Sequence, residues 1–373
     1  MPLIYVPHYE MAEDSAELRR YLGKGWAVAS PTAFDNAYNG ALTDDDLVFN
    51  NAALYTLRRM EVFDRRRIAV VGGSAGGYTA LMLSALQMGN CAAIATAPIS
   101  NVYFNFHQYF PMAAERDDAP FFLKLVVGMF LPVQENFPDK SDTARWEALS
   151  AVGLADCFSS PLAIVHVTSD ILVPIDQTTR SFTYDHEGAS MPEGFSTRLP
   201  MDAPGVLGRS LADELPQELT HIEHIRVTDP DEDSVLPYDK EEPFVLVIFD
   251  DGPTEATGSH RATAGKGIVD DIPYLEEMFS RSLAETELLM PGKLRLLLER
   301  CQGNSVQLPA HEGIDDTVYG SLAVYRQEIV EELRQWANDH SLAALDAAMQ
   351  EAAEGDEAYI ATWREIQMKL GMS

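Results

Sequence analysis

Short apolar runs alternate with longer stretches of helical apolar spacing over the first hundred residues. The runs that predict strands are residues 3–6, 26–30, 68–71 and 91–97, and the stretches that predict helices are residues 15–22, 47–60 and 78–88. Short apolar runs are typical of buried strands, and helices between them connect parallel strands by crossovers. The pattern therefore predicts an α/β fold, with a mostly parallel, doubly wound sheet covered by helices on both faces.

The alternation is interrupted in two places. Residues 101–160 are rich in aromatic side chains and predict a helical cap, although aromatic helices more commonly just pack on a sheet. Residues 161–170 restore the strand pattern. Residues 181–288 are acidic and lose the rhythm, so we expect an inserted subdomain there, with two strand-like runs, 221–227 and 244–249, in a sheet of its own.

The pattern returns near the end of the sequence. We expect a last strand at residues 305–308, a last sheet-covering helix at 320–336 and a final amphipathic helix at 342–369, interrupted near Gly355. The final helix could pack on its own domain or, less commonly, pair with a second copy and form a homo-oligomer. The expected division is a core of residues 1–100, 161–180 and 289–340, a helical cap of 101–160, an inserted subdomain of 181–288 and a C-terminal helix of 341–373.

Composition narrows the possible partners. The 373 residues are 46% hydrophobic and contain 27 Lys and Arg against 58 Asp and Glu, a net charge of −31. Such a charge repels nucleic acid and anionic membranes, so we expect neither as a partner and expect a small-molecule substrate instead. The three cysteines, Cys91, Cys157 and Cys301, match no disulfide or zinc spacing, which favours a cytoplasmic location. We expect no metal or other cofactor.

The clearest chemical motif is Gly-Gly-Ser-Ala-Gly at residues 72–76. It fits G-x-S-x-G and stands between an expected strand and an expected helix, the context that this motif requires for a nucleophilic serine. Ser74 is therefore the candidate nucleophile, and the N–H of Ala75 at the helix start is a candidate oxyanion donor. Glycine-rich turns also bind phosphates, but the sequence here has neither G-x-G-x-x-G spacing nor Gly-Lys-Ser/Thr.

A serine nucleophile requires a base and an orienting carboxylate, in the chain order serine, acid, histidine on this kind of sheet. Asp170 follows the strand at 161–168 and is the candidate acid, with Asp176 as the alternative. His311 follows the expected last strand and precedes the expected last sheet-covering helix, so it is the preferred base. His260 is the alternative, whereas His166 within a strand is expected to be a packed core residue.

Two segments together resemble a known family. Residues 72–81 and 168–177 resemble the α/β-hydrolases of the prolyl oligopeptidase branch, without the β-propeller. In that family Gly-Gly-Ser-x-Gly-Gly-Tyr carries the nucleophile and Asp-x-x-Val-Pro-x-x-Gln carries the acid. The resemblance implies an α/β-hydrolase fold with Ser74 as nucleophile, Asp170 as acid and His311 as base.

The sequence departs from the family in the loop that supplies the second oxyanion donor. The family has His-Gly-Gly after this strand, whereas residues 7–10 here are Pro-His-Tyr-Glu. The backbone N–H of Tyr9 is therefore expected to serve beside that of Ala75. The insertion between acid and base is also longer than usual.

These features predict a serine hydrolase that acts on an ester, thioester or amide of a small, largely apolar molecule through an acyl-enzyme. The first alternative is a bond-forming enzyme of natural-product biosynthesis on the same scaffold, such as a cyclase or acyltransferase. The second is a binding or assembly protein without turnover.

Overall fold

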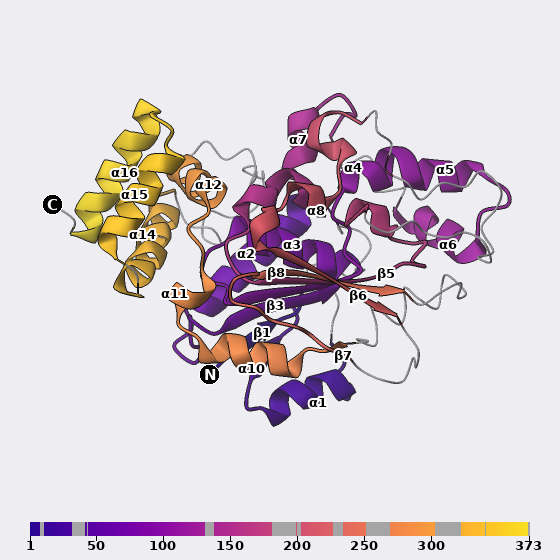
Figure 1. The fold of residues 1–373 in the computed structure, drawn as a ribbon, viewed down its shortest axis with the longest axis horizontal. Helices are drawn as coiled ribbons and strands as arrows, with labels where there is room; N and C mark the ends of the chain where they lie inside the picture. Colours follow the sequence, from indigo (N-terminus) through magenta and orange to yellow (C-terminus); the bar gives the residue numbers. More distant parts are fainter. Residues whose placement is uncertain are drawn as a thin grey trace.

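The computed structural model describes residues 1–7, 11–31, 42, 44–130, 138–180, 199, 203–226, 234–250, 269–302, 322–339 and 341–371. Figure 1 shows a central sheet crossed by helices on both faces, with the C-terminal helices gathered at one end of the molecule. The α/β fold class expected from the sequence is confirmed.

The central sheet has seven strands in the order β2-β1-β3-β4-β5-β8-β6, and every neighbouring pair is parallel. Its strands are β1 (Leu3–Tyr5), β2 (Ala27–Ala29), β3 (Ile68–Gly73), β4 (Ala92–Thr96), β5 (Leu162–Val167), β6 (Thr220–Arg226) and β8 (Phe244–Asp250). The inner strands β3, β4, β5 and β8 are apolar at nearly every position because helices cover both of their faces.

The helices divide between the two faces of the sheet. Helices α2 (Asp44–Arg58) and α3 (Ala75–Leu86) pack on one face together with the cap, and α1 (Ala16–Gly23) and α10 (Ile272–Ser280) pack on the other (Figure 1). Helix α1 begins at a serine cap, since the Ser15 hydroxyl accepts the Leu18 N–H at 3.2 Å. Both apolar faces of the sheet are thereby buried.

The expectation of a separate sheet in residues 181–288 is wrong for the two main runs. Strand β8 pairs with β5, and β6 pairs with β8, so both extend the central sheet. The residues explain the placement: β8 is apolar up to its final Asp250 and suits the sheet interior, whereas β6 is mostly polar, with only two isoleucines, and suits an edge. A short pair, β7 (Ser234–Val235) with β9 (Val269–Asp270), lies apart from that sheet.

The described residues between 102 and 157 are mostly helical, as the sequence predicts for this segment, which we call the cap. The segments are α4 (Val102–Phe104), the π-helix η1 (Asn105–Tyr109), α5 (Phe110–Glu115), α6 (Phe121–Phe130), α7 (Thr143–Ala148) and the 3₁₀ helix η3 (Ala151–Cys157). Most of the aromatic side chains pack inward into the core cluster shared with α3 and the sheet. Shorter helical turns elsewhere are η4 (Ile175–Gln177), η5 (Gly205–Gly208), α8 (Leu211–Glu214) and η6 (Gln217–Leu219).

The C-terminal helices form a cluster of their own. They are α11 (Leu283–Thr286), α12 (Pro291–Gln302), α14 (Leu322–Asp339), α15 (Leu342–Ala352) and α16 (Glu357–Leu370). The expected sheet-covering helix, α14, packs on these neighbours instead of on the sheet. The expected final helix is two helices, because Glu354 and Gly355 both have positive φ, at 48° and 80°. The expected strand at 305–308 lies outside the described residues.

Buried charges join this cluster to the C-terminal end of α3. The Lys293 ammonium on α12 donates to the carbonyls of Ser84 and Gln87 at 2.8 and 2.7 Å, and Arg300 donates to the Leu86 carbonyl at 2.5 Å. Cations at this end of a helix satisfy its last carbonyls and complement its dipole. Helix α12 therefore sits at the end of α3 that is remote from Ser74.

Candidate active site

Ser74 occupies a sharp turn between β3 and α3, as the motif predicts. Its backbone has φ of 54° and ψ of −120°, a conformation that is costly for a residue with a side chain. The Ser74 N–H donates to the Thr96 carbonyl at the end of β4 at 2.8 Å, which helps hold the turn. The side chain is half-buried, and its hydroxyl does not cap α3. A strained serine at a strand-to-helix turn is the geometry of a nucleophile elbow.

The glycines around Ser74 allow strand and helix to approach closely. A Cβ on Gly72 would lie 2.3 Å from the Gly76 carbonyl oxygen, and a Cβ on Gly77 would lie 3.1 Å from both Pro98 Cβ and the Thr96 carbonyl oxygen. A side chain at Gly72 would therefore force β3 away from the first turn of α3. The sequence requires glycine here for packing as well as for the turn.

The first turn of α3 lies directly beneath the serine. Ala75 is the first residue of the helix and is buried, and the first N–H groups of a helix have no partner within it. These groups and the positive end of the helix dipole suit an oxyanion. Tyr9, the expected second donor, lies outside the described residues.

Asp170 lies just beyond the end of β5, on the same edge of the sheet as Ser74. Its Oδ1 accepts the N–H groups of Leu172 and Val173 at 2.9 and 3.0 Å, and the side chain is buried. One strand, β4, separates β3 from β5, so the two strand ends are about 10 Å apart. A histidine between them could contact both residues.

His166 is a buried residue of β5, as expected. Its Nε2 lies 2.8 Å from the Val173 carbonyl oxygen and 3.8 Å from Asp170 Oδ2, and its Nδ1 lies 3.1 Å from the Thr178 hydroxyl. A carbonyl only accepts, so Nε2 carries the proton and Nδ1 accepts from Thr178. Both ring nitrogens thus hold the loop that follows β5 in place.

The alternative acid, Asp176, has a different setting. Its Oδ2 accepts the Leu199 N–H at 2.8 Å and lies 3.8 Å from Arg180 Nε. Arg180 also donates to the Gly208 carbonyl at 2.6 Å. Asp176 therefore connects the loop after β5 to a neighbouring segment.

The loop that carries Asp170 is tied to the cap. Gln177 Oε1 accepts the N–H groups of Ser100 and Asn101 at 3.0 and 3.1 Å, and the Ser100 hydroxyl donates to the Gln177 carbonyl at 2.7 Å. The Tyr109 hydroxyl donates to the Ile171 carbonyl. The glutamine of the Asp-x-x-Val-Pro-x-x-Gln motif thus fixes the start of the cap against this loop.

Both candidate bases, His260 and His311, lie outside the described residues. The structure does describe the strands and helices that precede and follow them in the sequence. His260 lies in the sequence between β8, which ends on the same sheet edge as β3 and β5, and α10, which packs on the sheet. His311 lies between α12 and α14, both in the C-terminal helix cluster. In the part of the chain that the structure describes, β8 is the last strand of the central sheet and α10 the last helix on it.

A group of polar side chains in the cap was not identified from the sequence. Asn105 begins the π-helix η1 and is fully buried, yet neither its Oδ1 nor its Nδ2 has a hydrogen-bond partner among the described residues. His107 Nε2 and Gln108 Oε1 in the same turn are buried without one as well. π-helical turns frequently occur at functional sites, and buried unpaired polar atoms require an explanation. Hydrophobic periodicity gives no signal for a π-helix.

Asp46 is a second buried carboxyl, beside helix α3. Its Oδ2 accepts the Thr79 hydroxyl of α3 at 3.2 Å, and its Oδ1 accepts Asn50 Nδ2 at 2.9 Å. Burial raises the pKa of Asp46 to about 7, and these hydrogen bonds lower it less. The folded protein therefore holds the neutral acid at low pH and the carboxylate above neutrality.

This carboxyl predicts a fall in stability as the pH rises. The folded-state pKa is above the unfolded value, so the contribution of Asp46 is fully present below about pH 4 and is lost as the pH rises through about 7. Urea unfolding at pH 5 and pH 8 measures the free energy of unfolding of the wild type and of Asp46→Asn. Between pH 5 and pH 8, the free energy of unfolding of the variant should rise by roughly 2–3 kcal/mol relative to that of the wild type. The exposed Asp14→Asn serves as control. A gain equal to that of the control would contradict the assignment.

In the part of the chain that the structure describes, neither a metal-binding cluster nor one of the two cavities described below involves the part of the sheet edge that carries Ser74 and Asp170. Among the described residues, no three His, Cys, Asp or Glu side chains lie together in a way that could hold a metal ion. An apolar cavity of about 480 Å³ lies between the end of β2 and α2, and a second cavity, of about 400 Å³ and lined mostly by charged side chains, lies at the end of α2. Neither is lined by Ser74 or Asp170.

No helix among the described residues is long and apolar enough to span a membrane.

Comparison with known proteins supports the resemblance. Residues 32–124, less than half of the chain, match the model of the prolyl oligopeptidase family. This segment includes β3, Ser74 and α3. A search of curated protein sequences finds no significant match.

Solved structures give distant likenesses. Pyrococcus horikoshii acylaminoacyl peptidase is 17% identical with a TM-score of 0.40, covering 77% of this chain and 37% of that chain. Porphyromonas gingivalis dipeptidyl peptidase 4 is 18% identical with a TM-score of 0.38, covering 75% and 31%. The structure of 2,6-dihydroxy-pseudo-oxynicotine hydrolase is 16% identical with a TM-score of 0.39, and the match covers 77% of this chain and 62% of that chain. The chain thus spans less than half the length of the two peptidases.

The fold and the family match agree at the turn that carries Ser74. The parallel sheet, the strained serine between β3 and α3, and the carboxyl after β5 occur in the order that the G-x-S-x-G motif requires. The chain is an α/β-hydrolase-fold protein whose residues 32–124 match the prolyl oligopeptidase family.

Proposed function

We propose that this protein is a serine hydrolase that cleaves an ester, thioester or amide of a small molecule through an acyl-enzyme. The observation that carries the proposal is the backbone of Ser74, held at positive φ between β3 and the N-terminus of α3. Strain of this kind persists where function requires it. The turn presents the hydroxyl at the sheet edge and places helix N–H groups beside it.

The proposed reaction has two balanced halves. Ser74 Oγ bonds to the substrate carbonyl carbon while the histidine base takes its proton, and the negative oxygen is stabilised by the Ala75 N–H. The tetrahedral intermediate collapses, the bond to the leaving group breaks, and the leaving group takes the proton from the histidine. Water then attacks the acyl-enzyme, giving its proton to the histidine, and Ser74 regains a proton as the acid product leaves.

Asp170 is the proposed orienting acid. Its Oδ1 is held by two backbone N–H groups, which fix the carboxylate at the end of β5. Asp176 already contacts Leu199 and Arg180, which suits a structural role. Asp170 follows the end of β5 more closely in the sequence than Asp176 does, and β5 ends at the sheet edge that carries Ser74.

His260 is the proposed base, in preference to His311. The base is expected between the last strand of the sheet and the last helix that covers it, and β8 and α10 fit this description. The strand order β3-β4-β5-β8 places the ends that precede nucleophile, acid and His260 along one edge. Helix α12, which leads toward His311, packs at the opposite end of α3, about 17 Å from Ser74 along the helix axis.

The cap supports a substrate with both apolar and hydrogen-bonding parts. Aromatic residues of the cap pack beside the loop that follows β5, and Asn105 adds a buried amide whose donor and acceptor have no partner among the residues that the structure describes. A substrate amide or ester could pair with these atoms and relieve the cost of leaving them unpaired. Turnover of matched p-nitrophenyl esters and aminoacyl anilides tests the proposal. Fluorophosphonate labelling without turnover of either would favour a bond-forming reaction, and no labelling would favour a binding protein.

The two acid candidates make a matched pair of variants. Asp170→Asn should lower kcat by about 10⁴-fold, because the imidazole loses its orienting carboxylate, whereas Asp176→Asn should keep kcat within the same order of magnitude. Steady-state kinetics on the preferred ester, with thermal unfolding of both variants, measures the difference. The reverse ranking would assign the acid to Asp176.

A further inference from the structure

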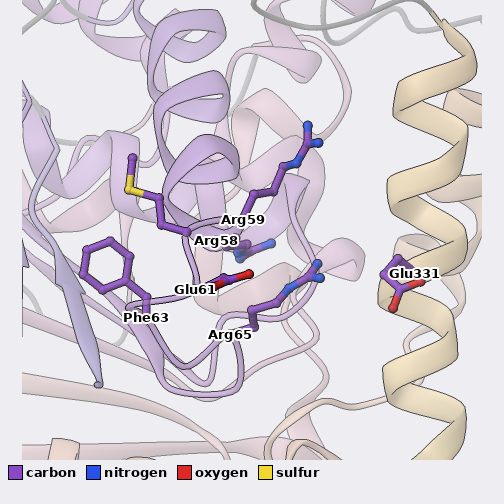
Figure 2. A pocket seen from close by; sticks show the side chains of 7 residues that line it. Arg58, Arg59, Glu61, Phe63, Arg65 and Glu331 are labelled. Atoms are coloured by element: carbon purple, nitrogen blue, oxygen red, sulfur yellow. The ribbon is translucent and has the colours of Figure 1, made fainter.

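A pocket at the end of α2 gathers three arginines in a strongly acidic protein. It has a volume of about 400 Å³ and is lined by Arg58, Arg59, Met60, Glu61, Phe63, Arg65 and Glu331. Figure 2 shows Arg59, Glu61 and Arg65 extending toward α14, which carries Glu331, while the Phe63 ring points the other way. The chain carries only 27 Lys and Arg in 373 residues, so such a grouping is unusual for its composition. The volume is within the range of small-molecule sites.

Arg58 forms a fixed wall of this pocket. Its side chain is 3% exposed, it donates to Asn90 Oδ1, and its Nη1 lies 3.9 Å from a Glu332 carboxylate oxygen. Its Nε is buried and has no hydrogen-bond partner among the described residues. A buried donor without a partner is costly, and in the part of the chain that the structure describes the Nε of Arg58 is such a donor.

Arg65 is the more accessible guanidinium. It is 25% exposed, and its described hydrogen bond runs from Nη2 to Glu332 Oε1 at 3.0 Å, while its Nε has no partner among the described residues. A guanidinium has five N–H donors in one plane, so Arg65 keeps donors for a second oxyanion. Glu332 is thus shared between Arg58 and Arg65, while Arg58 also interacts electrostatically with the buried Glu287.

The remaining lining defines the rest of the ligand. Glu331 on α14 is paired with Arg334 one turn along its own helix, which reduces its opposition to an anion. Phe63 and Met60 supply apolar surface beside the arginines. A ligand with an oxyanion at one end and an apolar group at the other would satisfy both parts.

We propose that this pocket binds a small organic anion, a phosphate or carboxylate that carries an apolar group, with Arg65 and Arg58 holding the oxyanion. The site lies between the end of α2 and the middle of α14, on the side of the sheet where β3 begins, opposite the edge that carries Ser74. A bound anion would link the α/β core to the C-terminal helices through Arg65 and stabilise their contact.

Calorimetric titration with phenyl phosphate, benzoate and benzyl alcohol tests the site. Phenyl phosphate or benzoate should bind the wild type at low salt, the uncharged alcohol should not, and the tighter anion identifies the headgroup. Arg65→Gln should weaken binding about 10-fold or more, because charge-assisted hydrogen bonds are lost. Arg66→Gln is the matched control, since Arg66 is exposed, adjacent and outside the lining.

A second variant keeps the result independent of folding. Glu331→Gln removes a negative charge from the lining and should tighten binding of the same anion, an effect that a damaged fold would not produce. Equal affinity of wild type and Arg65→Gln, or no binding of either anion at millimolar concentration, would overturn the proposal.

Discussion

Replacing Ser74 with alanine is expected to reduce kcat on the preferred ester by about 10⁴- to 10⁶-fold, to the level that oxyanion stabilisation and binding alone provide. The reason is chemical: no acyl-enzyme can form without the hydroxyl. The change is small in volume, and the Ser74 hydroxyl does not cap α3, so the fold should be retained. Kinetics and thermal unfolding of the same preparation measure both effects.

The control for this variant is Ser280→Ala. Ser280 is exposed at the end of α10 and donates to the Glu277 carbonyl at 2.7 Å. This variant therefore also removes one hydroxyl, but at a position away from the sheet edge that carries Ser74. Its kcat should equal that of the wild type. If Ser74→Ala kept more than about a tenth of wild-type kcat, the acyl-enzyme mechanism would be untenable.

The base gives the second large effect. His260→Ala should lower kcat by about 10⁴-fold or more, because the serine hydroxyl is a weak nucleophile without a base, while His311→Ala should leave kcat nearly unchanged. The pair differs only in position, so each variant is the other's control. Measuring kcat for both, with thermal unfolding to exclude loss of fold, separates the two candidates.

The opposite result would have a clear meaning. A large loss in His311→Ala with normal turnover in His260→Ala would show that the segment after α12 reaches the sheet edge. The topological argument from β8 and α10 would then be wrong. Large losses in both variants with normal unfolding would also contradict the assignment of a single base to His260.

Sequence periodicity predicted the first half of the fold because each element there is locally encoded. The runs that became β3 and β4 are continuous and apolar, and Gly72 and Gly77 are required by close contacts that the motif already implies. The sharp turn at Ser74 could be predicted for the same reason, since one short segment contains the strand end, the serine and the helix start.

The second half depends on long-range pairing that periodicity does not record. Strand β8 was expected in a separate subdomain, yet its apolar residues on both faces place it inside the central sheet beside β5. The preference for His311 rested on the expected strand at 305–308, which lies outside the described residues, so the choice between His311 and His260 stays a prediction. Asn105 was missed because a buried, unpaired amide becomes visible only when its surroundings are known.

The C-terminal helices show the same limit in another form. The amphipathic pattern of residues 342–369 predicted a helix and its break near Gly355, both of which the structure contains. It could not show which surface the apolar face covers. In the structure this face packs on α12 and α14, and α12 is joined to the end of α3 through Lys293 and Arg300.

The most direct measurement is peptide mapping by mass spectrometry after treating the wild-type protein with a fluorophosphonate. The account predicts one phosphonyl group per chain, attached to Ser74, with no adduct in Ser74→Ala. The strained turn between β3 and α3 is what should make this serine react ahead of the others. An adduct on a different residue, or a wild-type protein that stays unlabelled, would contradict the account.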